Sequence, residues 1–183
     1  MGNREDLLAA AKHLVVSQGI SSTSLRDVAQ AAGVSMAAVG YHFGSVQALL
    51  TRALVDALDE WGTQFQSSAV PEALGERIDR VLQTTVEHRD LATASIEAAV
   101  QARSSEVVRQ HLAEGQQDAR RGLAAAALGV SEADVEEGAV SSLGSVHLAL
   151  VTGLMIQVLI DPELAPTTDQ VLEGLFRLSS AST

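Results

Sequence analysis

Residues 24–43 read SLRDVAQAAGVSMAAVGYHF and decide the fold of the N-terminal part of the chain. Ser24 is a preferred helix N-cap, and Asp27 can return a hydrogen bond to that cap and oppose the positive end of the helix. Gly33 suits the left-handed position that follows a helix. Ser35 then caps a second helix almost at once. Two short helices joined by a tight glycine turn form a helix-turn-helix, which is suited to placing its second helix in a groove of DNA.

Helical periodicity continues through almost the whole chain, and no segment reads convincingly as a strand. We therefore predict an all-α fold of about nine helices, with a DNA-binding domain of three helices at residues 1–52. Residues 53–183 are expected to form a larger helical domain for ligand binding and dimerisation. A second capping box, Ser131 with Asp134, is expected to open a long helix. The expected helices lie near 3–18, 24–31, 35–41, 45–66, 72–88, 90–102, 104–128, 131–160 and 168–179.

The composition excludes several functional classes. The 183 residues contain no cysteine, so disulfides, thiolate metal sites and cysteine nucleophiles are ruled out. The histidines lack metal-binding spacing, and neither GxSxG nor a phosphate-binding glycine loop occurs, so we expect no enzyme, metal site or cofactor. The N-terminus does not read as a signal peptide. The longest apolar run, 146–160, is shorter than the about 20 residues of a membrane helix, and we expect a soluble, cytoplasmic protein.

The charge is distributed unevenly along the chain. The formal net charge is −11, which is unusual for a DNA-binding protein. Residues 1–52, however, carry four basic and three acidic side chains, and the acidic excess lies in the remainder. A net charge of +1 is still a weak electrostatic footprint for DNA. We therefore expect modest non-specific affinity, with binding that depends on helix N-termini and base contacts.

The first ~50 residues resemble the DNA-binding domain of the TetR family of bacterial transcriptional regulators. The matching pieces are LLAAAKHLVVSQGI at 7–20, SSTSLRDVAQAAGVS at 21–35, YHF at 41–43 and ALL at 48–50. The resemblance implies a homodimer, ligand-gated repression and the family's all-helical fold. Two positions depart from the pattern, because Gly40 replaces a frequent tyrosine and Val46 a frequent lysine that hold DNA phosphates. Tyr41 and the backbone N–H groups after Ser45 could substitute for them.

The candidate DNA-binding residues belong to the helix-turn-helix and to the cap that follows it. Arg26 matches the family's base- or phosphate-contacting arginine, although a solvated side chain is the alternative. Ala37 and Ala38 could at most touch a thymine methyl group. Met36 could contact the groove or pack internally, and the backbone N–H groups after Ser45 form a generic phosphate site. The full set is Ser24, Arg26, Ser35, Met36, Ala37, Ala38, Gly40, Tyr41, His42 and Ser45.

The C-terminal domain offers polar groups near apolar helix faces. Each one could be a satisfied core or interface residue, whereas together they could line a small-molecule pocket. His147 could equally face a dimer partner. The candidate ligand-binding residues are Trp61, Phe65, Glu97, Gln101, His111, His147, Thr152 and Gln157.

Two segments suggest a dimer interface. Residues 146–160 are apolar nearly all round, so such a helix must be covered on more than one side. Gly144 and Gly153 could allow a partner backbone to approach closely. We expect the helices near 134–160 and 168–179 from each subunit to form a four-helix interface, as the resemblance also implies.

These observations lead to two functional hypotheses. The leading one is a homodimeric TetR-type regulator, expected to be a repressor, that binds palindromic operator DNA and is released by a small, mostly apolar ligand. The alternative is a helical module for small-molecule binding or protein interaction whose DNA-binding head has weakened. The identity of the effector, the operator and the regulated genes does not follow from the sequence.

Overall fold

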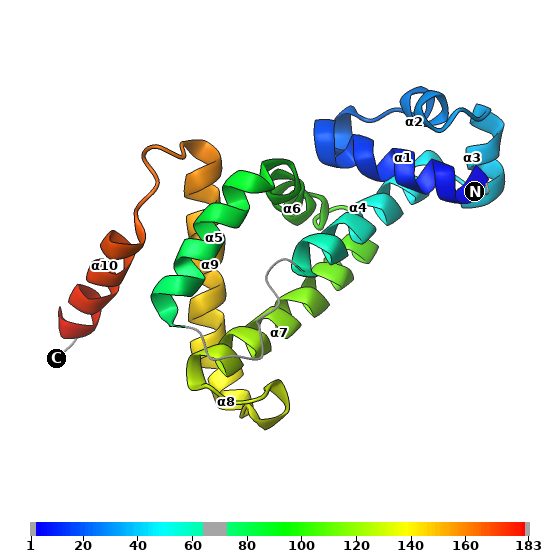
Figure 1. The fold of residues 1–183 in the computed structure, drawn as a ribbon. Coiled ribbons are helices and arrows are strands. Elements are labelled where there is room, and N and C mark those ends of the chain that lie inside the picture. The colour runs from blue at the N-terminus through cyan, green and yellow to red at the C-terminus, as the bar shows by residue number, and fades with distance from the viewer. Residues whose placement is uncertain (1–2, 64–72, 182–183) are drawn as a thin grey trace. The chain divides into compact units, whose positions relative to one another are not determined.

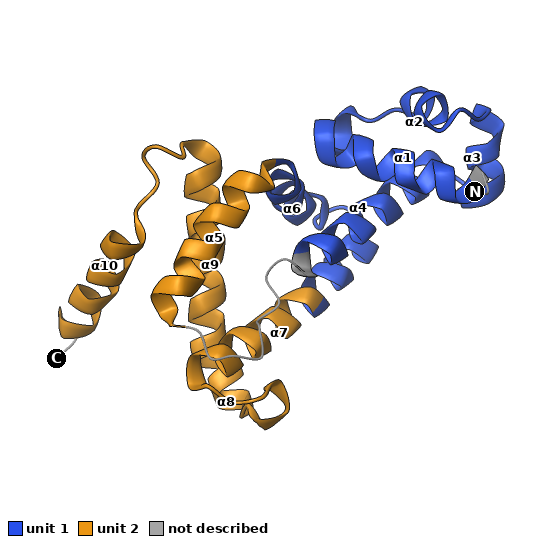
Figure 2. Ribbon diagram, in the orientation of Figure 1, with its two compact units in different colours: residues 1–64, 90–114 blue, residues 65–89, 115–183 orange. Residues whose placement is uncertain are grey.

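The computed structural model describes residues 3–63 and 73–181, and every regular element within these ranges is helical (Figure 1). The predicted all-α class is therefore confirmed. The chain divides into two compact units, Met1–Gln64 with Asp90–Glu114 (unit 1) and Phe65–Arg89 with Gly115–Thr183 (unit 2), shown in Figure 2. The functional division at residue 52 stays a prediction, because compactness does not test function.

Unit 1 is built around the N-terminal helices. It contains α1 (Asn3–Gln18), a 3₁₀ turn at Ile20–Ser22, α2 (Leu25–Ala32), α3 (Met36–Phe43), α4 (Val46–Thr63), nearly all of α6 (Arg89–Gln101) and the first part of α7 (Glu106–Leu128). Helix α1 packs against α2, α3 and α4. Leu7, Val28 and Leu49 are fully buried in the shared core. Ala98 of α6 and Val108 of α7 join the same core, so these later helices support the N-terminal domain.

Unit 2 is built around one long helix pair. It contains α5 (Leu74–Glu87), the second part of α7, α8 (Glu137–Ala139), a π-helical segment (Val140–Gly144), α9 (Ser145–Ile160) and α10 (Thr168–Ala181). Helix α5 lies along α9, and Ile78, Val81 and Leu154 form the buried centre of their contact. Helix α10 packs against α5. A hydrogen bond from the Thr168 hydroxyl to the Asp79 carboxylate joins these two helices.

The long helix of unit 2 begins later than the sequence predicts. Ser131 opens only a short 3₁₀ turn, and its hydroxyl donates to the Asp134 carboxylate at 2.6 Å instead of capping the backbone. Val135 then has extended backbone angles and is buried, so the chain leaves the helical conformation there. The helix starts at Glu137 and passes through the π-helical segment into α9. The predicted capping box at Ser131 is therefore wrong.

Gly144 has a different role from the predicted one. A Cβ atom on Gly144 would lie 2.2 Å from the carbonyl oxygen of Arg120, which is backbone of α7 in the same chain. The glycine therefore permits a close contact between α7 and the π-helical segment, and not the expected approach of a partner subunit. Gly153 differs, since nothing lies within 4 Å of its position for a Cβ atom.

The helical stretch Glu137–Ile160 is long and apolar enough to cross a membrane by length and composition, although the sequence run 146–160 seemed too short. Buried core helices of soluble proteins can meet the same criterion. Here, however, only 22% of the most apolar window is buried within the chain. An apolar surface of this extent is usually covered by another surface.

Candidate DNA-binding surface and effector cavity

The turn between α2 and α3 has the chemistry that the sequence predicts. The Asp27 N–H donates to Ser24 Oγ at 3.3 Å, and the Ser24 N–H donates to Asp27 Oδ2 at 2.9 Å. The Ser24 hydroxyl also donates to Asp27 Oδ2 at 2.5 Å, and this bond, together with the one from the Ser24 N–H, holds the pKa of Asp27 below its usual value. Gly33 has φ 67°, and its N–H closes the helix end. The predicted capping box and glycine turn are thus confirmed, and they fix the angle at which α3 leaves α2.

The next two caps behave differently. Ser45 accepts a hydrogen bond from the Ala48 N–H at 3.1 Å and so caps α4 as predicted. Ser35 stands at the N-cap position of α3, but its hydroxyl makes no capping hydrogen bond. Only its carbonyl takes part, accepting from the Ala38 N–H at 3.0 Å. The predicted capping role of the Ser35 side chain is therefore wrong, which leaves this exposed hydroxyl at the start of the helix.

Helix α3 presents one continuous exposed face. Met36 is 53% exposed and Tyr41 86% exposed, and Ala37 and Gly40 between them are also exposed. A Cβ atom on Gly40 would meet nothing within 4 Å, so the surface is open there. Ala38 instead packs partly against the core of unit 1, beside buried Val39. The exposed residues recur at the spacing of one helix face, which is therefore short, smooth and largely apolar.

The two aromatic residues at the end of α3 contact each other. The ring of Tyr41 meets that of His42 edge to face, with 4.9 Å between centroids. His42 is half-buried, so the pair anchors one side of an otherwise exposed tyrosine. The Tyr41 hydroxyl is thus presented on a ring whose orientation is supported.

The basic residues of the N-terminal segment are mostly engaged within unit 1. Lys12 pairs with Glu60 at 2.5 Å, and Arg52 pairs with Asp56 at 2.7 Å. The Arg4 guanidinium lies 5.2 Å above the ring of Phe43. The candidate Arg26 is exposed on α2. Because the acidic partners come from α4 beyond residue 52, the local charge is even less positive than the composition of 1–52 suggests.

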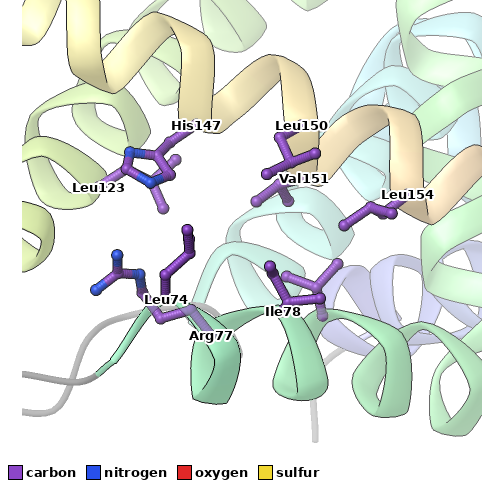
Figure 3. A pocket seen from close by; sticks show the side chains of 9 residues that line it. Leu74, Arg77, Ile78, Leu123, His147, Leu150, Val151 and Leu154 are labelled. Atoms are coloured by element: carbon purple, nitrogen blue, oxygen red, sulfur yellow. The ribbon is translucent and has the colours of Figure 1, made fainter. Parts of the chain in front are cut away.

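Unit 2 encloses a small cavity between α5 and α9 (Figure 3). Its volume is about 20 Å³, which is room for about one water molecule. The lining residues are Leu74, Arg77, Ile78, Val81, Leu123, His147, Leu150, Val151 and Leu154. His147 is the sequence candidate that this cavity includes. Its Nδ1 atom is buried.

Arg77 is the cavity residue that sequence reasoning missed. Its Nη1 atom donates to the carbonyl oxygen of Ala126 at 3.2 Å, which links α5 to the end of α7. Burial lowers the pKa of His147, and the positive charge of Arg77 lowers it further. A hydrogen bond with the backbone of Leu143 acts in the opposite direction and raises this pKa. A signal was present in the sequence, because Arg77 interrupts the apolar face that Leu74, Ile78 and Val81 form.

Several other predicted ligand residues lie in unit 1. Glu97 approaches the turn after α1, since a Cβ atom on Gly19 would lie 2.8 Å from its Oε2 atom. Gln101 donates to the Ser21 hydroxyl at 3.5 Å. His111 of α7 is 3.2 Å from a carboxylate oxygen of Asp59 in α4. Trp61 is buried near the end of α4.

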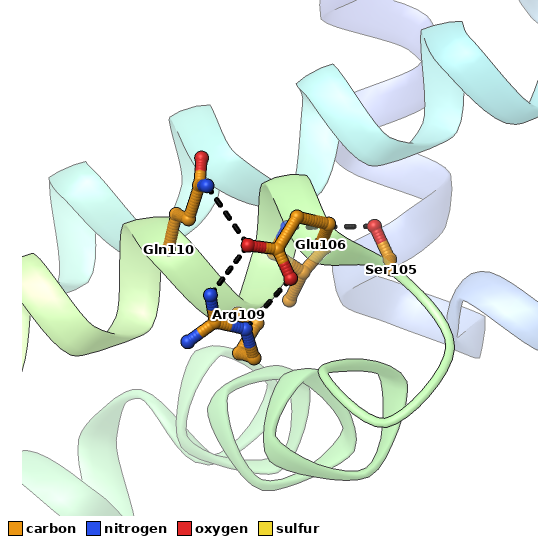
Figure 4. Close-up of polar contacts among 5 residues, drawn as sticks. Ser105, Glu106, Arg109 and Gln110 are labelled. Atoms are coloured by element: carbon orange, nitrogen blue, oxygen red, sulfur yellow. Dashed lines mark hydrogen bonds and ion pairs between the residues drawn. The ribbon is translucent and has the colours of Figure 1, made fainter.

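The start of α7 is fixed by its own polar residues (Figure 4). Ser105 Oγ accepts from the Val108 N–H at 3.4 Å. The Glu106 carboxylate accepts from Arg109 Nε at 2.7 Å and from Gln110 Nε2 at 2.8 Å. These contacts lower the pKa of Glu106 and raise that of Arg109. They hold the first turn of α7 in the register that buries Val108 in unit 1.

Two further candidates, Thr152 and Gln157, do not line the cavity of unit 2. Thr152 is half-buried on α9, and Gln157 is exposed and donates to the Gly153 carbonyl oxygen at 3.4 Å. Phe65 lies outside the described residues. The predicted ligand set is therefore divided between the two units, and His147 is the member that the structure places beside a cavity.

Comparisons with known proteins show what the N-terminal segment and the fold are similar to. Residues 7–53 match the family model described as bacterial regulatory proteins, tetR family. A proposed transcriptional regulator from Streptomyces coelicolor A3(2) is 24% identical, with 96% of each chain covered and a TM-score of 0.73. A tetR-family transcriptional regulator from Streptomyces coelicolor is 19% identical, covering 98% of this chain and 85% of that chain, with a TM-score of 0.71.

A third solved structure is that of the multidrug binding protein EbrR complexed with proflavin. It is 21% identical, covers 97% of this chain and 99% of its own, and has a TM-score of 0.71. No curated sequence matches the chain. The chain thus has the fold of TetR-family transcriptional regulators, and its residues 7–53 match the family's N-terminal model.

Proposed function

We propose that the protein is a cytoplasmic transcriptional regulator that binds palindromic operator DNA as a homodimer and leaves it when a small, mostly apolar ligand binds. The observation that carries this proposal is the exposed face of α3, held by the capped turn at Ser24 and Gly33. A helix presented in this way fits the major groove. Repression is the expected outcome of operator binding.

The chemistry of α3 indicates how the operator is read. Met36 and Ala37 can make apolar contacts with thymine methyl groups, and the exposed Ser35 hydroxyl can bond a base edge or a phosphate. Tyr41, His42 and the N–H groups that begin α4 after Ser45 supply phosphate contacts, with Arg26 beside them. Direct contacts with base edges then contribute more to the affinity for operator DNA than long-range electrostatic attraction does.

Dimerisation is supported by the uncovered apolar surface of unit 2. Val146 and Ile160 of α9 are 64% and 78% exposed, and Phe176 and Leu178 of α10 are 72% and 69% exposed. These are large apolar side chains on the two helices that the sequence assigns to the interface. A second subunit would cover them in a self-complementary contact, and the pair would present two α3 helices to one palindrome.

Ligand response is supported by the cavity in unit 2 and by the complex of EbrR with proflavin, a protein of the same fold. A ligand releases DNA only if it binds one conformation of the protein more tightly than the other. No enzymatic function is proposed, since the structural neighbours described above are regulators and a multidrug binding protein.

A DNA titration tests the proposal. The full chain is titrated against labelled DNA that flanks its own gene and against random DNA of the same length, with fluorescence anisotropy as the readout. Arg26→Ala should weaken the specific complex. Arg103→Ala is the matched control, because Arg103 is also exposed in unit 1 but lies after α6, outside the helix-turn-helix. Equal losses in both variants would contradict a role for α2 in DNA binding.

The same titration decides between the regulator and the alternative module. The ion pairs of Lys12 and Arg52 with acidic residues favour the alternative, in which the N-terminal domain binds DNA weakly. Binding to the flanking DNA without preference over random DNA at low salt would support the module.

Sedimentation tests the dimer. Phe176→Glu should yield monomers, whereas Val107→Glu, exposed on α7 in unit 1, should stay dimeric. A monomeric wild-type chain would refute the proposed assembly.

A further inference from the structure

The exposed face of α3 has a centre with very small side chains. Met36 begins this face and Tyr41 ends it, and both are large and exposed. Between them lie exposed Ala37 and Gly40, whose side chains are a methyl group and a hydrogen atom. Because a helix rises about 1.5 Å per residue, Met36 and Tyr41 are separated by about 7.5 Å along its axis, which spans roughly two steps of B-DNA. The face therefore has a low, apolar centre with a larger side chain at each end.

Gly40 is not required by the fold of unit 1. Its backbone φ angle is not positive, so the conformation does not demand a glycine. A Cβ atom on Gly40 would meet nothing within 4 Å, so packing does not demand one either. Glycine within a helix lowers stability relative to alanine, but it also lets a ligand approach the backbone closely. The space at Gly40 is therefore best explained by a group that DNA places there.

The chemistry of this centre favours an apolar group on the DNA. In the major groove, the C5-methyl group is the apolar feature by which thymine differs from the other bases. Met36 is flexible and polarisable and can pack against such a methyl group, and Ala37 contributes a methyl group of its own. Met36, Ala37 and Gly40 have no side-chain donor with which to read a purine edge. These residues therefore detect the methyl group and not the polar edge of the base pair.

Thymine and 5-methylcytosine carry this methyl group at the same ring position. They differ in the neighbouring polar group, which is the O4 acceptor in thymine and the N4 amino donor in cytosine. A protein that prefers thymine must donate a hydrogen bond to O4 without accepting one from N4. Met36 has only a weak acceptor sulfur, and the hydroxyl groups of Ser35 and Tyr41 can both donate and accept. The exposed face of α3 therefore carries no side chain that selects thymine over 5-methylcytosine.

We infer that α3 recognises the C5-methyl group of a pyrimidine, in thymine and in 5-methylcytosine alike, so that methylation of cytosine at the contacted positions strengthens DNA binding. This inference rests on the proposed function, because it requires α3 to lie in the major groove. The partner is duplex DNA with C5-methylated pyrimidines at the positions that Met36, Ala37 and Gly40 face. Methylation adds an apolar contact and leaves the charge of the DNA unchanged.

The test uses duplexes that differ at one kind of position. The full-length protein is titrated with labelled DNA that flanks its own gene, and this DNA is shortened to the smallest duplex that retains specific binding. Replacing each thymine by uracil in turn identifies the pairs whose methyl group contributes. At these pairs, duplexes with thymine, cytosine and 5-methylcytosine are then compared by fluorescence anisotropy.

Methylation of cytosine should tighten binding about fourfold per contacted position, because burial of one methyl group contributes about this factor. A palindrome contains each position twice, so the complete operator should gain about fifteenfold. The 5-methylcytosine duplex should approach the affinity of the thymine duplex. A 5-methylcytosine duplex that binds no more tightly than its cytosine counterpart would overturn the inference, and so would the lack of any thymine whose replacement by uracil weakens binding.

Variants locate the methyl contact on α3. Met36→Ala should reduce the effect of cytosine methylation, and Gly40→Gln should remove it by filling the space beside Ala37. Gly115→Gln is the matched control, because Gly115 is also exposed within a helix and has nothing within 4 Å of its position for a Cβ atom, but lies on α7. An unchanged methylation effect in both α3 variants would overturn the inference. Should Gly40→Gln fail to bind DNA, the comparison of Met36→Ala with the wild type still decides.

The same titrations separate this inference from the proposed function. Binding without preference for the flanking DNA over random DNA would refute the proposed regulator, and the inference with it. Specific binding that responds neither to uracil nor to cytosine methylation would overturn the inference alone and leave the regulator intact. Specific binding that strengthens on cytosine methylation supports both.

Discussion

Gly144→Ala should destabilise unit 2, because the added methyl group has no space. Its carbon would lie 2.2 Å from the carbonyl oxygen of Arg120 and 2.8 Å from the carbonyl carbon. Both are backbone atoms of α7, so no side-chain rotation can relieve the contact. Overpacking of this kind costs roughly 1–3 kcal/mol, and the better helix propensity of alanine offsets up to about 1 kcal/mol. We expect a net loss of roughly 1–2 kcal/mol.

Thermal unfolding followed by circular dichroism measures this loss. For a domain of this size, it corresponds to a Tm lowered by roughly 2–8 °C. Gly115→Ala is the matched control, since Gly115 lies within α7, is exposed and has nothing within 4 Å of its position for a Cβ atom. That variant should gain up to about 1 kcal/mol through helix propensity alone.

The substitution should also affect the cavity. His147 lies three residues after Gly144, and Leu123 lies three residues after Arg120, so a shift between their helices moves two walls of the cavity. If Gly144→Ala were as stable as Gly115→Ala, the close packing of α7 on the π-helical segment would be refuted.

Four further predictions concern DNA binding and stability. Val46→Lys, whose lysine stem can keep the partial core contact of Val46, should add one phosphate contact per subunit. The slope of log K against log[salt] would steepen by about 1.8 in a dimer. Raising the salt from 50 to 200 mM would therefore weaken DNA binding by the variant about twelvefold more than binding by the wild type. Gln47→Lys is the control, because Gln47 is the exposed neighbour of Val46. Equal slopes in the two variants would contradict a phosphate contact at position 46. Ser24→Ala should lose roughly 1 kcal/mol of unfolding free energy and Ser24→Asp much less, as measured in urea; equal losses would exclude the cap as the cause. Operator DNA with uracil in place of thymine should bind about fourfold more weakly per contacted methyl group, as measured by fluorescence anisotropy. Met36→Ala should reduce this difference in affinity between the two DNAs, and equal affinities of the wild type for both would exclude contacts with the methyl groups. Because the pKa of His147 is lowered in the folded state, the unfolding free energy should fall as the pH drops below about 6.5. His147→Gln should make the unfolding free energy less dependent on pH, and the same pH profile in variant and wild type would contradict the lowered pKa.

The sequence predicted the parts of the candidate DNA-binding surface that depend on neighbouring residues. The capping box at Ser24, the left-handed Gly33 and the cap at Ser45 each need only a few residues on either side, and all three are present. Ser131 shows the limit of such reasoning. The same residue types stand at the same spacing, but no backbone N–H donates to the Ser131 hydroxyl, and the chain then turns to bury Val135.

Contacts between distant residues were much harder to predict. Helical periodicity shows that a helix has an apolar face, but not which other helix that face meets. Glu97 and His111 were therefore grouped with His147, although they approach Gly19 and Asp59 in unit 1. Arg77 was missed for the same reason, since its role arises from the position of His147, which is 70 residues away in the sequence.

The weak charge of the N-terminal domain fits the proposed ligand control. Lys12 and Arg52 are engaged with Glu60 and Asp56, so much of the affinity must come from the face of α3 and its direct contacts. Such contacts require both α3 helices to be correctly positioned on one DNA duplex. Non-specific electrostatic binding through counterion release does not require this positioning. A ligand that binds one conformation of the protein tenfold more tightly than the other shifts the conformational equilibrium at most tenfold. A small shift of this kind can empty the operator only if non-specific attraction does not hold the displaced protein on DNA, and a nearly neutral DNA-binding domain meets that condition.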